Sequence, residues 1–223
     1  MSIESVNITK EYERRGKTFR AVDDVSISIP RGKITVVTGN SGSGKSTLLN
    51  ILAGMIVPEN GTVHIDDVEL PSLKNKERDK IRGEKIGIVP QVQSLIGGLT
   101  VRENIKLQQS FSGGAADEER LAFYIKDLGI EDLMDVFPSS LSGGELKRAA
   151  VVRAISGDHD YIFADEPTGE LDPENASRIM DAFRKLADEG KGILLITHDS
   201  HVEERADILY RMENGHLTEE KVG

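Results

Sequence analysis

The chain has 223 residues, of which 38% are hydrophobic and 30% charged, and its formal net charge is −10. This length and composition are typical of one folded globular domain with at most a small lobe attached. The acidic balance argues against nucleic acid as a partner, because such binding relies on a broad basic face, although backbone amides and a few cations can still bind phosphate. The absence of cysteine excludes disulfides, thiol catalysis and cysteine-based zinc sites.

Neither export nor membrane insertion is expected from the sequence. No apolar run approaches the roughly 18 to 20 residues that a membrane-spanning helix needs. The first residues carry charges where a signal peptide would need an apolar core.

The first third of the chain predicts two strands and a helix around a glycine-rich break. From Val25 to Ile29, apolar residues alternate with polar ones, as in a half-exposed strand. Residues 34–37 form a compact apolar run that suits a buried parallel strand. Glycines between Gly39 and Gly44 then interrupt the chain, and residues 46–53 are predicted to form a helix that Gly54 ends.

The middle of the chain, from about Thr100 to Ser156, has a helical pattern without a convincing strand. Thr100 and Glu103 form a capping box that opens a helix, and residues 111–114 end it. The next helix has an apolar stripe made of Leu121, Tyr124, Ile125 and Leu128. A helical insertion of this size in an α/β chain predicts a small separate lobe.

Three further buried strands are predicted by apolar runs at residues 85–89, 161–164 and 193–197. Strands separated by helices imply a parallel sheet with helices on both faces. We therefore expect a single domain over residues 1–223. Its α/β core is predicted at residues 1–91 and 158–223, and its helical lobe at residues 92–157.

The glycine-rich break fits a phosphate-binding loop. The residues from Gly39 to Ser46 read GNSGSGKS, which matches the P-loop pattern G-x-x-x-x-G-K-[ST] between a strand and a helix. Glycines let the backbone turn its N–H groups around phosphates, and the helix N-terminus adds a favourable dipole. Lys45 would then reach the β- and γ-phosphates, and Ser46 would ligate magnesium. The alternative is a glycine-rich turn without a ligand. The position of the loop between a strand and a helix argues against this alternative.

A second motif is an apolar strand, residues 161–164, that ends in the carboxylates of Asp165 and Glu166. This is the pattern of a Walker B strand, in which Asp165 holds magnesium at the carboxyl edge of the sheet. Glu166 would then polarise the attacking water as a general base. By itself the pattern favours an ordinary acidic loop after a strand, but downstream of a P-loop the functional interpretation is favoured.

The third motif is the pentapeptide LSGGE at residues 141–145. Ser142 and Glu145 by themselves fit a capping box for the following helix, but such a box requires neither the two glycines nor the leucine. Here the sequence resembles the ATP-binding-cassette (ABC) family, whose signature is LSGG followed by Gln or Glu. The resemblance covers nearly the whole chain, and it implies an α/β fold. That fold has a P-loop NTPase core with a mostly parallel sheet, an N-terminal antiparallel β part and a helical signature subdomain.

The resemblance also implies roles for individual residues. The nucleotide-binding residues it implies are Tyr12, Gly39, Asn40, Ser41, Gly42, Ser43, Gly44, Lys45, Ser46 and Thr47. The implied magnesium ligands are Ser46, Gln91 and Asp165, and the catalytic residues are Glu166, His198 and Lys45. The signature residues, implied to contact the ATP of a second copy, are Leu141, Ser142, Gly143, Gly144 and Glu145. The D-loop would be Gly169, Glu170, Leu171 and Asp172.

Several of these residues have ordinary alternatives when taken alone. Tyr12 fits a surface tyrosine, Gln91 a loop residue, and His198 a solvated histidine after a strand. Asp172 also has a structural role, as the N-cap of a helix that starts at Pro173. The order in which all the motifs occur supports the family interpretation.

The finer resemblance is to the branch of macrolide exporters, lipoprotein-releasing systems and peptide or haem efflux pumps. It rests on Asp165–Gly169 with the Leu171-Asp172 pair, and on Leu99–Asn104. The chain departs from this branch at Glu170, where Asn is usual, at Pro90, where an aromatic is common, and at residues 96–98. The departures leave the branch and the substrate open.

The resemblance implies ATP and Mg²⁺ as cofactors, a second copy of the chain as a partner, and a transmembrane permease subunit that the chain joins at the cytoplasmic face of the membrane. An exporter or extractor of hydrophobic or amphipathic substrates is expected. The expected permease-docking residues are Gln91, Leu95, Ile96 and Leu99, because apolar side chains in a surface loop tend to mark a protein contact. The alternative is that these side chains pack under their own lobe.

Other classes that carry these motifs fit less well. DNA-repair and chromosome-organising ATPases insert a long coiled coil before the signature, whereas Ser142 follows Lys45 by only 97 positions. Ribosome-associated members have two cassettes in one chain, and this chain has one. A division- or signalling-linked cassette, whose membrane partner transmits force without transport, stays open as an alternative.

Overall fold

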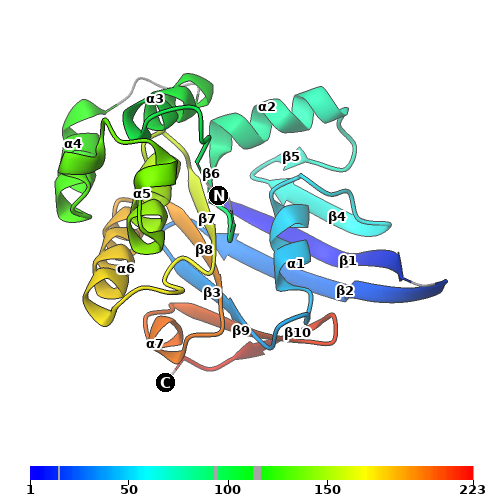
Figure 1. The fold of residues 1–223 in the computed structure, drawn as a ribbon. Coiled ribbons are helices and arrows are strands. Elements are labelled where there is room, and N and C mark those ends of the chain that lie inside the picture. Colours follow the sequence, from blue (N-terminus) through cyan, green and yellow to red (C-terminus); the bar gives the residue numbers. More distant parts are fainter. Residues whose placement is uncertain (15, 93–94, 113–116, 223) are drawn as a thin grey trace.

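The larger of two sheets contains six strands in the order β10–β9–β3–β8–β7–β6 (Figure 1). These are β3 Ile34–Thr38, β6 Ile86–Val89, β7 Tyr161–Asp165, β8 Gly192–Thr197, β9 Ile208–Glu213 and β10 His216–Glu220. All neighbours pair in parallel except β10, which pairs antiparallel with β9. The expected mostly parallel sheet is therefore confirmed in the computed structural model, which describes residues 1–14, 16–92, 95–112 and 117–222.

The central strands are apolar because both faces of the sheet are covered. Every residue of β3, β7 and β8 is buried. Since successive side chains point to opposite faces, Val36 and Ile162 enter one core cluster while Val37 and Phe163 enter another. The apolar runs in the sequence thus predict buried parallel strands correctly.

The smaller sheet is antiparallel and has the order β2–β1–β4–β5. Its strands are β1 Ser2–Arg14, β2 Lys17–Pro30, β4 Asn60–Ile65 and β5 Val68–Glu69. Val25, Ile27 and Ile29 of β2 are buried and the residues between them are more exposed, which confirms the predicted alternation. This sheet forms the antiparallel N-terminal part of the fold.

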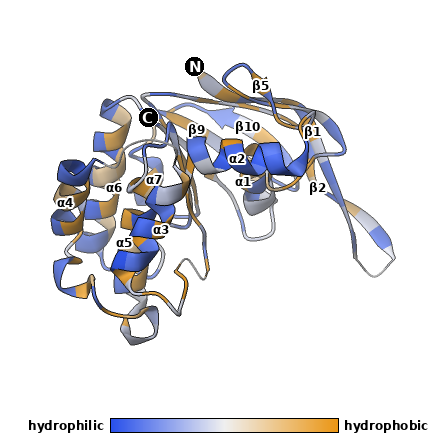
Figure 2. Cartoon of the chain, turned by 90° about the horizontal axis from the view of Figure 1, so that it is seen from above, coloured by the Kyte–Doolittle hydropathy of each residue, from blue (hydrophilic) through white to orange (hydrophobic). Residues whose placement is uncertain are grey.

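Helix α1, Lys45–Leu52, lies between the two sheets and contacts β1, β2, β7 and β8. It ends at Leu52, and Gly54, two residues later, has a φ of +68° that fits the left-handed position after a helix. Helix α2, Asn75–Lys85, has no buried residue and is almost entirely hydrophilic (Figure 2). The strand predicted at residues 85–89 starts one residue later than expected, because Lys85 is the last residue of α2.

The helical middle packs against the face of the large sheet away from α1 (Figure 1). Its elements are α3 Val101–Phe111, α4 Glu118–Asp127, the 3₁₀ turns η1 Glu131–Leu133 and η2 Pro138–Ser140, and α5 Gly143–Ile155. Within the described residues no strand interrupts this region, as predicted. The capping box of Thr100 and Glu103 is present, and α3 ends at Phe111; the predicted stop residues Gly113 and Gly114 lie outside the described residues.

Two further helices complete the fold: α6 Pro173–Asp188 and α7 Ser200–Glu203. Helices α3 to α6 share one continuous apolar cluster with the sheet, so the helical region is joined to the strands through buried contacts. Among the helices in the described residues, none has the length and apolar character needed to cross a membrane.

Candidate active site

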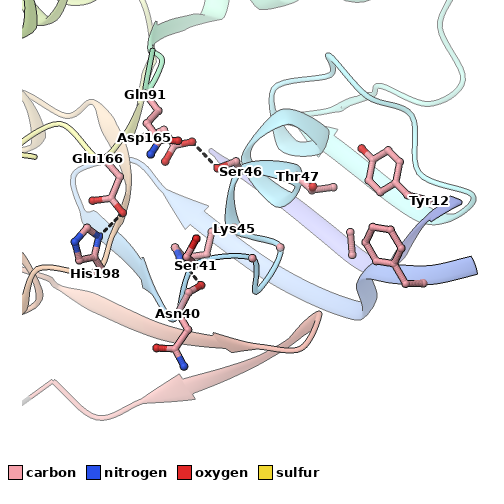
Figure 3. A pocket seen from close by; sticks show the side chains of 14 residues that line it. Tyr12, Asn40, Ser41, Lys45, Ser46, Thr47, Gln91, Asp165, Glu166 and His198 are labelled. Carbon is pink, nitrogen blue, oxygen red and sulfur yellow. Dashed lines mark hydrogen bonds and ion pairs between the residues drawn. The ribbon is translucent and has the colours of Figure 1, made fainter. Parts of the chain in front are cut away.

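An open cavity lies at the carboxyl edge of the large sheet, where the loops after β3, β6, β7 and β8 meet (Figure 3). Gln91, Asp165, Glu166 and His198 border one side of it, and Tyr12 borders the opposite side. The residues from the glycine-rich loop that line it are Asn40, Ser41, Gly42, Gly44, Lys45, Ser46 and Thr47. The carboxyl edge of a parallel sheet is the usual place for a ligand in an α/β fold.

The loop before α1 has the conformation of a phosphate cradle. Gly39 and Gly44 have φ values of +146° and +112°, which favour glycine. A Cβ atom at Gly39 would lie 2.1 Å from the carbonyl oxygen of Met212, and one at Gly44 would lie 2.0 Å from that of Ala21. Both positions therefore require glycine, because of their backbone conformation and because a Cβ atom would not fit. The loop can thus lie close against β9 and β2.

Lys45 is buried at the base of this loop, and its ammonium faces the same cavity. Nζ donates hydrogen bonds to the backbone oxygens of Gly39, at 2.7 Å, and Asn40, at 3.0 Å. The loop thus positions a cation beside the amides of a helix N-terminus. This combination attracts an anionic phosphate group.

Ser46 and Asp165 lie side by side at the wall of the cavity (Figure 3). The Ser46 hydroxyl donates a 2.6 Å hydrogen bond to Asp165 Oδ2. Burial raises the pKa of the Asp165 carboxyl above its ordinary value, and the hydrogen bond from Ser46 opposes this shift. Hydroxyl and carboxylate oxygens are ligands that Mg²⁺ prefers, so this pair fits a hard divalent cation.

Glu166 directly follows β7 and has an unusual backbone conformation, with φ at +51°. Its carboxylate accepts a hydrogen bond from the Thr197 hydroxyl at 3.2 Å and lies 2.7 Å from His198 Nδ1. The last residue of β8 and the residue after it thus orient the carboxylate that follows β7. Non-glycine residues with positive φ concentrate at functional sites, where the surrounding structure fixes them.

Tyr12 borders the far end of the cavity together with Phe19, a residue that sequence reasoning missed. The two rings face each other across the β1–β2 ladder, with centroids 6.0 Å apart. Lys10 Nζ lies 5.6 Å from the Tyr12 ring. This aromatic pair is a suitable surface for stacking a planar base.

Gln91 follows β6 and borders both this cavity and a second one, which Glu166 and His198 also line. Among the apolar residues of the segment after Gln91, Leu95 packs against the core cluster. This is the alternative considered from the sequence, in which these side chains pack inward and do not form a docking surface. Leu99 is half-buried, whereas Val92 and Ile96 are 72% and 49% exposed. The exposed apolar surface of this segment is therefore made by Val92 and Ile96; residues 93 and 94 lie outside the described part of the chain.

The signature residues, all within the described chain, are not part of the first cavity. Ser142 is exposed at the start of α5, and its hydroxyl and backbone N–H both donate to Glu145 Oε2, at 2.7 and 2.8 Å. The hydrogen bond from the Ser142 N–H is the main reason that the pKa of Glu145 is lowered. The capping box is thus present, with Ser142 and Gly143 exposed at the start of α5 and Leu141 and Gly144 half-buried.

The predicted D-loop connects β7 to α6. Gly169 and Glu170 lie in a turn after Glu166, where Glu170 has a φ of +67°. Leu171 packs against the core cluster. Asp172 is the N-cap of α6, since its carboxylate accepts the Asn175 N–H at 3.0 Å, and Pro173 is the first helical residue. The structural role expected for Asp172 is confirmed.

Known proteins resemble the chain in sequence and structure. The ABC transporter family model matches residues 22–169. LolD, the lipoprotein-releasing system ATP-binding protein of Buchnera aphidicola, is 36% identical over 222 residues, which cover 98% of this chain and 97% of LolD. The methionine import ATP-binding protein MetN 4 of Oceanobacillus iheyensis is 37% identical over 98% of this chain, which spans 64% of MetN 4.

A solved structure agrees in fold over the whole chain. It is a dimer of the ATP-binding cassette MJ0796, from Methanocaldococcus jannaschii, in a post-hydrolysis state with ADP and Pi bound. Its TM-score is 0.92 at 34% sequence identity, and the match covers 99% of both chains. The chain belongs to the ABC transporter family, and it is an ATP-binding cassette that hydrolyses ATP.

Proposed function

We propose that this cassette forms a dimer around two ATP·Mg²⁺ and drives a separate membrane permease. The observation that carries the proposal is the division of the site within one chain. Lys45, Asp165 and Glu166 share one cavity, whereas Ser142 lies on a helix outside it. One chain therefore supplies one side of a nucleotide site, and a second copy supplies the other.

Within that site, Ser46, Asp165 and Gln91 would hold Mg²⁺. The 2.6 Å contact between the Ser46 hydroxyl and Asp165 supports this assignment, because it places two oxygen donors at the cavity wall. When bound, the ion neutralises charge on the β- and γ-phosphates.

Glu166 is proposed to be the general base for hydrolysis. A water oxygen bonds to the γ-phosphorus while Glu166 accepts a proton from that water, and the bond from phosphorus to the β–γ bridging oxygen breaks to give ADP and phosphate. Lys45 stabilises the negative charge on the phosphates. His198, which contacts Glu166 at 2.7 Å, is exposed and free to turn towards the γ-phosphate when ATP enters.

The second copy would approach with its signature helix. The N-terminus of α5 carries the Ser142 hydroxyl and the amides of Gly143 and Gly144, groups that suit a phosphate. The dimeric structure of the relative MJ0796 with ADP and Pi supports this pairing. ATP then joins the two copies, and hydrolysis releases them.

The permease would dock near the segment that follows Gln91, which would place the cassette at the cytoplasmic face of the membrane. Val92 and Ile96 expose apolar surface there. A groove between α2 and α3 adds exposed Met55 and Phe111, and Ile88 of β6 also lines it. Because Gln91 borders the nucleotide cavity, the segment after it would move when the nucleotide site closes. That movement would pass directly to a helix of the permease.

The substrate is proposed to be hydrophobic or amphipathic, and its movement to be export or extraction. This rests on LolD, which the chain matches over 97% of its length and whose name refers to lipoprotein release. Import of a small molecule, as named for MetN 4, and force transmission without transport are the competing outcomes.

Isolation of the cassette from membranes together with its permease, followed by reconstitution in phospholipid vesicles, tests this proposal. ATP should release a lipid-anchored test polypeptide from the vesicles, and the V92E/I96E variant should lose permease binding and stimulated ATPase. V68E, which alters an exposed valine of β5, is the matched control and should retain both. ATPase activity that the permease stimulates without release of any polypeptide would favour force transmission. Normal binding of V92E/I96E to the permease would place the docking surface elsewhere.

A further inference from the structure

The side chain of Lys147 reaches from helix α5 to the turn that carries Glu166. Lys147 lies in the second turn of α5, and its Nζ donates a 3.0 Å hydrogen bond to the backbone oxygen of Glu166. Both residues line the second cavity, together with Gly143 and Glu170. A cation from the signature helix therefore reaches the backbone of the proposed general base within the same chain.

The backbone of Glu166 needs such support, because its φ of +51° is unfavourable for a residue with a Cβ. Its N–H donates to the Ile196 oxygen at 2.8 Å, which fixes the entry to the turn. Its carbonyl oxygen accepts from the Gly169 N–H at 3.3 Å and from Lys147. The Lys147 bond is the shorter of the two, and it is charge-assisted, so it is the stronger restraint on this peptide group.

The surroundings of Lys147 favour this contact. The side chain is half-buried, and burial lowers the pKa of its ammonium, while the carboxylates of Glu170, Asp165 and Glu166 attract the charge. An ammonium that has left bulk water needs a partner for its N–H groups. The carbonyl of Glu166 meets this need.

We propose that Lys147 is a positioning residue, which holds the Glu166 peptide in the conformation that aims its carboxylate at the attacking water. Because Lys147 belongs to α5, the same contact transmits movement of the signature helix to the general base of its own chain. This proposal rests on the proposed role of Glu166. Lys147 does not line the nucleotide cavity, so we expect it to act on the rate of the chemical step and not on the binding of ATP.

The test measures kcat, KM and equilibrium binding of a fluorescent ATP analogue for Lys147→Met. A charge-assisted hydrogen bond lost from a partly buried carbonyl corresponds to a decrease in kcat of roughly tenfold or more, and KM and analogue affinity should stay within about twofold. Lys147→Arg retains a cationic donor and should recover most of kcat. The matched control is Lys191→Met, which removes another largely buried lysine, paired with Asp158 at 3.0 Å before the amino end of β8, and should leave kcat unchanged.

A double-mutant cycle separates this proposal from the role of Glu166. In single-turnover measurements, Lys147→Met should have little further effect in a Glu166→Gln background, because the two changes remove the same function. An equal loss of rate in both backgrounds would show that Lys147 acts independently of Glu166 and would overturn the proposal, as would an unchanged kcat in Lys147→Met alone. Near-normal turnover of Glu166→Gln by itself is a different result, since it removes Glu166 from the role of general base.

Discussion

The hydroxyl of Ser46 donates a 2.6 Å hydrogen bond to Asp165, although 119 positions separate the two residues in the chain. The order of the strands explains this contact. Ser46 lies in the first turn of α1 after β3, Asp165 is the last residue of β7, and both strands flank β8. A parallel sheet gathers the carboxyl ends of its strands at one edge, so the phosphate loop and the acidic residues meet there.

The first prediction concerns the cation of the phosphate loop. Lys45→Ala should weaken ATP binding by roughly tenfold to a hundredfold, because charge-assisted hydrogen bonds to the phosphates are lost. Isothermal titration with ATP and Mg²⁺ measures the effect. Lys33→Ala, which removes an exposed lysine just before the amino end of β3, is the control. Equal affinity of both variants would show that this loop does not bind the phosphates.

The second prediction tests the aromatic pair. Phe19→Ala should raise the Kd for ATP by roughly twofold to tenfold, in line with the energy of about 0.5–1.5 kcal/mol that aromatic pairs contribute. Phe137→Ala removes a ring of similar exposure outside the cavity and should leave the Kd unchanged. If Phe19→Ala binds ATP as tightly as the unaltered chain, Phe19 is not part of the base site.

Phe19 also illustrates the limit of sequence reasoning. The phosphate loop and the strand before Asp165 have a spacing and an apolar pattern that predict them directly. Phe19 lies beside Tyr12 only because β1 and β2 pair in this register, and no motif in the sequence predicts that pairing. Helix α2 escapes prediction because it has no buried face and therefore no apolar periodicity.

The segment after Gln91 shows the same limit for surfaces. Its apolar residues predict a contact, but spacing does not tell which of them packs inward. Leu95 is held against the core while Ile96 is exposed. Burial depends on how η2 and α5 are placed beside the segment, which is a tertiary property.

The third prediction is that Ser142 acts on the nucleotide of a second copy. Ser142→Arg alone and Lys45→Ala alone should each be inactive, whereas an equal mixture should recover activity in about a quarter of the sites, because half of random dimers hold one intact site. Thr100→Arg removes the equivalent N-cap of α3 and controls for loss of helix stability. Normal ATPase activity of Ser142→Arg by itself would contradict the arrangement.

The fourth prediction concerns stability at acidic pH. Burial lowers the pKa of His159 from 6.5 to about 4, so the unfolded chain takes up a proton at a higher pH than the folded chain. Stability therefore falls as the pH drops from 6.5 towards 4, by about 2 kcal/mol at pH 5. Urea unfolding at pH 7 and pH 5 should show a smaller difference for His159→Gln. An identical pH dependence in both proteins would show that folding does not lower the pKa of His159.

The most direct test of the account is the turnover of Glu166→Gln, with Glu174→Gln of the exposed first turn of α6 as its control. The 2.7 Å contact with His198 and the left-handed backbone place the Glu166 carboxylate at the cavity wall. Without that carboxylate, kcat should fall by roughly 10² to 10⁴, because no group accepts the proton of the attacking water. ATP binding should persist, and an ATP-bound dimer should accumulate in size-exclusion chromatography. Near-normal turnover, with no dimer retained in ATP, would contradict the assignment of Glu166 as the general base.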